Sequence, residues 1–92
     1  MHRKLIHPNG HIEERVIWAV PESMQYPEGI RYRLVYVHRP GGEILALYDN
    51  HYPKGHHRHF LGAESAYVFL GMEKLMEDFA NDIEEVIIHE SA

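Results

Sequence analysis

The chain has 92 residues, of which 45% are hydrophobic and 25% charged, and it carries a formal net charge of −5. This length predicts one small domain over residues 1–92, and the absence of cysteine excludes disulfides, thiolate catalysis and zinc sites that need sulfur. There is no apolar run of about eighteen residues to span a membrane and no long apolar region at the start, so a cytoplasmic protein is expected.

The charge is distributed unevenly along the chain. Residues 1–63 carry eight Lys and Arg against six acids, whereas residues 64–92 carry one Lys against eight acids. Such asymmetry predicts two faces with different partners, although an acidic helix face that only contacts solvent gives the same pattern.

The first elements are expected to be strands. Asn9-Gly10 separates two strand-like runs, residues 4–7 and 11–20, which is typical of a β-hairpin. Residues 31–38 are rich in β-branched and aromatic side chains, and residues 43–48 return after a turn at 39–42. Short turns between consecutive strands predict an antiparallel β-meander of about four strands.

One long helix is expected near the C-terminus. Apolar side chains there recur at spacings of three and four, the period of a helix that buries one face. These residues are Met72, Leu75, Met76, Phe79, Ile83 and Val86. Packing this stripe on one face of the meander gives an α+β domain.

The segment 48–59 holds four of the nine histidines, together with lysine, arginine, aspartate and asparagine. Such residues can transfer protons, neutralise phosphate or bind a metal near neutral pH. On an extended backbone His57 and His59 share a face, and Arg58 points the other way. With Lys54 they form a candidate group for RNA cleavage, in which two histidines act as acid and base and the ammonium offsets phosphorane charge.

Other residues are predicted to support this group. Asp49 and Asn50 would position a histidine or the substrate, Arg58 would assist Lys54, and the strand residues Arg31 and Arg33 would extend a phosphate track. These five form the predicted substrate-binding set.

Two alternatives use the same segment. His57-Arg58-His59 is an H-x-H pair that Asp49 or His51 could complete as a zinc site. The histidines are also consistent with an exposed polar loop that has no chemistry.

The elements Asp49-Asn50 and Lys54-Gly55-x-His57-x-His59 are followed by a helix that carries Leu75, Asp78, Phe79 and Asp82. This pattern resembles the TumE-like toxin proteins over residues 15–85. The resemblance implies the toxin of a type II toxin–antitoxin system, neutralised by a helix-turn-helix antitoxin that binds it directly. Within that motif it selects Asp49, Asn50, Lys54, Gly55, His57 and His59.

We therefore expect a toxin that is a metal-independent endoribonuclease, by analogy with other small toxins. Its catalytic residues would be Lys54, His57 and His59, with no cofactor and no bound metal. Its partners would be RNA and the antitoxin, with a homodimer as a further possibility. The alternatives are a non-catalytic module that binds nucleic acid or protein, and a histidine-based metal-binding protein.

Overall fold

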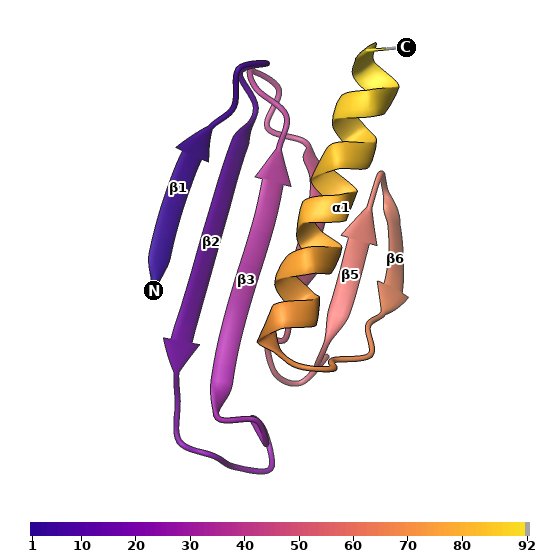
Figure 1. Cartoon of the computed structure of the whole chain (residues 1–92). Helices are drawn as coiled ribbons and strands as arrows, with labels where there is room; N and C mark the ends of the chain where they lie inside the picture. The colour runs from indigo at the N-terminus through magenta and orange to yellow at the C-terminus, as the bar shows by residue number, and fades with distance from the viewer. Residues whose placement is uncertain (92) are drawn as a thin grey trace.

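The computed structural model describes residues 1–91 and places one helix across one face of an antiparallel sheet (Figure 1). The six strands of the sheet are neighbours in chain order. They are β1 (His2–Ile6), β2 (Ile12–Ala19), β3 (Ile30–Val37), β4 (Ile44–Asp49), β5 (His57–Phe60) and β6 (Ala63–Ala66), and the helix is α1 (Met72–Ser91).

The predicted α+β meander with a C-terminal helix is confirmed, but the expected count of about four strands is too low. The two additional strands, β5 and β6, come from the histidine-rich segment and the residues that follow it. Neither strand has an apolar run that would mark it in the sequence. β5 is extended because it pairs with β4, and β6 because it pairs with β5.

The core lies between α1 and the central strands. Side chains alternate across a strand, so Tyr32, Leu34 and Tyr36 of β3 all point toward the helix and are fully buried. They pack with the predicted helix stripe, of which Leu75 and Phe79 are also fully buried. No helix within residues 1–91 is both long and apolar enough to cross a membrane.

The other face of the sheet is not covered by the helix and carries many polar side chains. The register aligns these side chains in rows across the strands. One row runs through Val16, Arg33, Asp49 and His57, and the next runs through Glu14, Val35, Leu47, His59 and Glu64. We call this surface the open face.

A tight turn brings β6 against β5. Phe60 pairs with Ala63, so only Leu61 and Gly62 form the loop, and both have positive φ, 48° and 87°. This conformation matches the two-residue turns that suit the twist of a hairpin. Gly62 adopts it without cost, whereas Leu61 is strained there.

Candidate active site

His57 and His59 lie side by side on the open face, as their spacing predicts for an extended strand. Their ring centroids are 5.4 Å apart. His57 is opposite Asp49 of β4, and Asp49 is in turn opposite Arg33 of β3. The paired strands of one sheet thus hold two imidazoles, a carboxylate and a guanidinium in neighbouring positions.

The imidazole of His57 is buried and its tautomer is fixed by the backbone. Its Nδ1 lies 2.8 Å from the carbonyl oxygen of Gly55, which can only accept a hydrogen bond. Nδ1 must therefore carry the proton, and Nε2 is left to accept a proton or bind a ligand. Gly55 has a positive φ of 73°, a conformation that favours glycine at this position.

The surroundings of His59 favour its neutral form. Burial lowers the pKa of His59, and the nearby His57 and Lys54 lower it further, while Asp49 acts in the opposite direction. The ordinary pKa of histidine is about 6.5. Because the pKa of His59 is lower, His59 becomes protonated only at more acidic pH than a free histidine does. A neutral imidazole at pH 7 can serve as a general base.

Glu64 of β6 completes this group, and it was not among the residues predicted from the sequence. It is opposite His59 in the sheet, with Oε2 3.5 Å from Nε2 of His59, and it forms an ion pair with Lys54. A hollow of about 320 Å³ opens beside Lys54, His57 and Glu64. The two-residue turn at Leu61-Gly62 is the sequence signal that could have placed Glu64 opposite His59.

Two predicted arginines also lie on the open face. Arg33 shares a row with Asp49 and His57. Arg31 lies one row further along, with its guanidinium 4.8 Å from the ring centroid of Trp18. Trp18 is 40% exposed, and an exposed ring beside a cation is the kind of surface on which nucleic-acid bases stack.

Arg58 lies on the opposite face of β5 and does not join the histidine group. Its guanidinium donates two hydrogen bonds of 2.8 Å to Asp82 of α1, and the Tyr48 hydroxyl donates to the same carboxylate at 2.7 Å. We call these three side chains the Arg58 clasp. It joins β4, β5 and α1, and it lines a separate hollow of about 350 Å³ beside Asp78.

Asn50 is buried and binds the backbone of β3. Its side chain accepts a hydrogen bond from the Tyr32 amide at 2.8 Å and donates one to the Ile30 carbonyl at 3.0 Å. The oxygen and the nitrogen of the Asn50 side-chain amide thus both hold the residue after β4 against the start of β3. Asn50 can shape the loop that carries Lys54, but it does not face the hollow beside the histidines.

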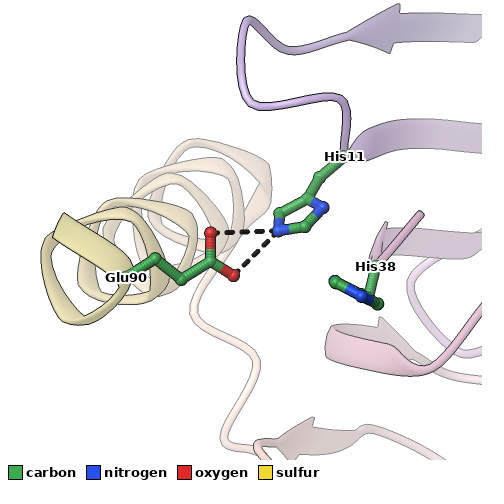
Figure 2. A group of neighbouring side chains, drawn as sticks. All are labelled: His11, His38 and Glu90. Carbon is green, nitrogen blue, oxygen red and sulfur yellow. Dashed lines mark hydrogen bonds and ion pairs between the residues drawn. The ribbon is translucent and has the colours of Figure 1, made fainter. Parts of the chain in front are cut away.

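A second group of histidine and glutamate lies at the far end of α1 (Figure 2). The buried His11 places Nε2 2.8 Å and 3.0 Å from the two carboxylate oxygens of Glu90, and the ring of His38 lies beside it. His11 precedes β2, His38 follows β3, and Glu90 is near the end of the helix. The contact holds this end of α1 against the sheet.

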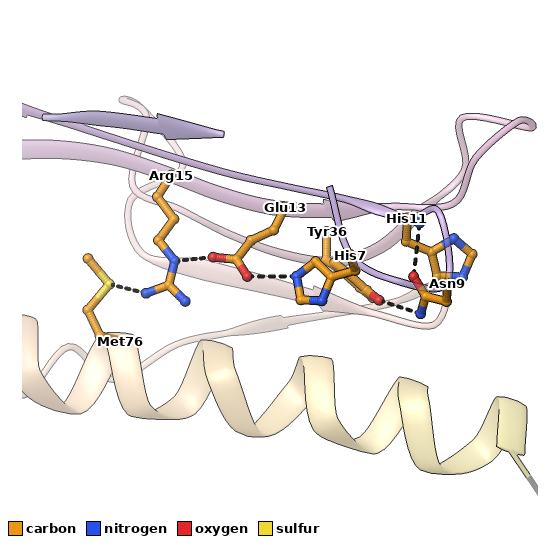
Figure 3. Close-up of polar contacts among 7 residues, drawn as sticks. All are labelled: His7, Asn9, His11, Glu13, Arg15, Tyr36 and Met76. Carbon is orange, nitrogen blue, oxygen red and sulfur yellow. Dashed lines mark hydrogen bonds and ion pairs between the residues drawn. The ribbon is translucent and has the colours of Figure 1, made fainter. Parts of the chain in front are cut away.

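Polar contacts continue from there along the helix side of β2 (Figure 3). Arg15 and His7 both bind the carboxylate of Glu13, and the Asn9 amide donates to the Tyr36 hydroxyl. Burial raises the pKa of Glu13, but the hydrogen bonds of Arg15 and His7, together with their charge interactions, more than offset it and hold the pKa below its ordinary value. The contacts secure the first hairpin.

Comparison with known proteins points to one family. The family model described as Toxin TumE matches residues 3–87. No curated protein and no solved structure gives a significant match. The match includes the whole histidine group of the open face and the Arg58 clasp.

Proposed function

Because the chain belongs to the TumE toxin family, we propose that it is the toxin of a toxin–antitoxin pair and that it cleaves RNA without a metal ion. The observation that carries this proposal is the juxtaposition of His57 and His59 on the open face, 5.4 Å apart, with Lys54 beside them. Two imidazoles at this spacing can reach different oxygens of one phosphate.

The surroundings of each imidazole suggest its role. His59, with its lowered pKa, would take the proton from a ribose 2′-OH, which then attacks the adjacent phosphorus. His57, with both ring nitrogens protonated, would give the proton of Nε2 to the departing 5′-oxygen while the Nδ1 proton remains bound to Gly55. The products would be a 2′,3′-cyclic phosphate and a free 5′-hydroxyl.

The charge of the phosphorane needs a cation in place before the reaction. Lys54 lies close enough to His59 to act on it, and RNA would compete with Glu64 for the Lys54 ammonium. Arg33 and Arg31 continue the positive charge along the open face, and Trp18 offers a ring for a base. The antitoxin would act by binding this protein, and the acidic exposed side of α1 suits a basic partner.

The test is cleavage of labelled RNA in EDTA by wild type, His57→Ala and His59→Ala, with RNA affinity measured separately. Loss of a proton-transfer group is expected to slow cleavage by about 10²–10⁴-fold and to leave affinity within a few fold. His2→Ala is the matched control, because His2 lies on the exposed edge strand β1 and away from the group. Cleavage that persists in the double variant would overturn the assignment, and lost affinity with no cleavage by wild type would indicate a binding module.

A further inference from the structure

We propose that His57, His59 and Glu64 form a binding site for a divalent transition-metal ion, with Zn²⁺ the best match, and that an ion bound there blocks RNA cleavage. Metal binding is argued from the geometry of the three side chains. Only the blocking effect rests on the proposed function.

The three ligand atoms already lie close together. One ring nitrogen of each histidine and one oxygen of Glu64 are all within 4.8 Å of one another, and Nε2 of His59 is 3.5 Å from Oε2 of Glu64. Bonds of about 2.0–2.1 Å in a tetrahedral zinc site place neighbouring ligands about 3.3–3.4 Å apart. The His59–Glu64 pair nearly meets this spacing. The His57 nitrogen lies within 4.8 Å of the other two ligand atoms, so binding would draw the three groups closer together.

His57 has the second contact that metal-binding histidines usually have. A ligating imidazole almost always donates its other N–H to a carboxylate or a backbone carbonyl, which fixes the ring and the tautomer. Nδ1 of His57 makes this bond to Gly55, and it leaves the lone pair of Nε2 available. The ring is also buried, so little side-chain entropy remains to be lost.

The set of ligands indicates the kind of metal. Two imidazoles and one carboxylate suit zinc and other first-row ions, and three protein ligands leave a position open for water. Two of the three ligands, His57 and Glu64, also line the hollow of about 320 Å³. Lys54 pairs with Glu64 in the free protein, so an incoming cation must displace the ammonium. Removal of Lys54 should therefore tighten metal binding.

The group at His11, His38 and Glu90 has the same residue types but is less suited to a metal (Figure 2). Nδ1 of His11 faces the backbone N–H of Arg39 at 3.4 Å, and an N–H group can only donate. His11 therefore carries its proton on Nε2 and donates it to Glu90. A metal ion on Nε2 would move that proton to Nδ1, where it would oppose the Arg39 N–H.

The consequence for activity follows from the atoms involved. A metal ion on His59 occupies the lone pair that would accept the 2′-OH proton. A metal ion on His57 occupies the nitrogen that would donate to the leaving oxygen. An occupied site can perform neither transfer, so cleavage should fall as the site fills.

The first experiment is calorimetric titration of the full, untagged chain with ZnCl₂. Wild type and Glu90→Gln should bind one ion at this site with equal affinity, Glu64→Gln should bind it at least about tenfold more weakly, and Lys54→Met more tightly. Glu64 is 38% exposed, so the amide substitution is not expected to impair folding, and melting curves check this. Equal affinity in wild type and Glu64→Gln, or a loss confined to Glu90→Gln, would overturn the proposal.

The second experiment follows RNA cleavage over a series of zinc concentrations. Inhibition should track the occupancy measured by titration and should reverse with EDTA. Zinc that binds but leaves cleavage unchanged would refute the blocking effect alone. A wild type that never cleaves RNA would refute the proposed function, and the titration would still decide whether the site binds metal.

Discussion

Arg58→Ala should destabilise the protein by about 2–3 kcal/mol and leave its RNA affinity unchanged. The substitution removes both 2.8 Å hydrogen bonds to Asp82 and leaves that carboxylate, only 10% exposed, with the Tyr48 hydroxyl. Hydrogen bonds to charged groups contribute about 1.5–3 kcal/mol, and breaking a buried pair costs about 3–5 kcal/mol. We take the lower part of this range because a third of the Arg58 side chain is exposed to solvent.

Thermal and urea unfolding of wild type, Arg58→Ala, Asp82→Ala and the double variant measure the effect. For a chain of this size the melting temperature should fall by about 10–20 °C in Arg58→Ala. The double variant should lose less than the sum of the single losses, because the second substitution removes a group that has already lost its partner. Lys74→Ala, which breaks an exposed pair with Asp78, is the control and should leave the melting temperature nearly unchanged.

Two results would refute this reasoning. A melting temperature of Arg58→Ala within about 2 °C of wild type would mean that the clasp contributes little to stability. A folded Arg58→Ala protein with RNA affinity reduced more than about tenfold would mean that Arg58 contacts RNA, as the sequence alone predicted.

Three further predictions concern single positions. Titration followed by NMR should give His59 a pKa below its ordinary value. Lys54→Met should raise that pKa because it removes a nearby positive charge, and the acid limb of the pH–rate profile for cleavage should move to higher pH. An unmoved titration curve would show that Lys54 does not act on His59. Leu61→Asn should stabilise the protein by about 1 kcal/mol in urea unfolding, because asparagine tolerates the positive φ of 48° better than leucine does, and no gain would contradict the strain inferred for this turn. Asn50→Ala should cost about 1–3 kcal/mol, measured in the same way, because it leaves the Tyr32 amide and the Ile30 carbonyl without their partner.

The sequence predicted the elements whose pattern is local. Asn9-Gly10 marked the first hairpin, the β-branched and aromatic residues of 31–38 marked a strand, and the apolar stripe marked α1, all of which the structure confirms. The spacing of His57 and His59 was also sufficient to place both on one face. That residues 1–92 form one domain stays a prediction.

The sequence could not predict features that depend on pairing between distant segments. β5 has the sequence His-Arg-His-Phe and β6 has Ala-Glu-Ser-Ala, and neither favours a strand by composition. Glu64 was missed because this hairpin was not predicted, and the turn at Leu61-Gly62 was its one local signal. Arg58 was expected to assist Lys54. The sequence did not reveal that Arg58 binds Asp82 instead, because Asp82 is 24 positions away and on the helix.

The position of β5 and β6 at one edge of the sheet determines how the site should respond to partial unfolding. All four residues of β6 are exposed, and β6 pairs with β5 alone, so its amides should exchange with solvent before those of the buried β3 and β4. The hairpin that carries His57, His59 and Glu64 can then open while the helix and the central strands remain folded. Activity and metal binding would be lost at a lower denaturant concentration than the one that unfolds the core. The Arg58 clasp, which ties β5 to α1, would determine the difference between these two concentrations.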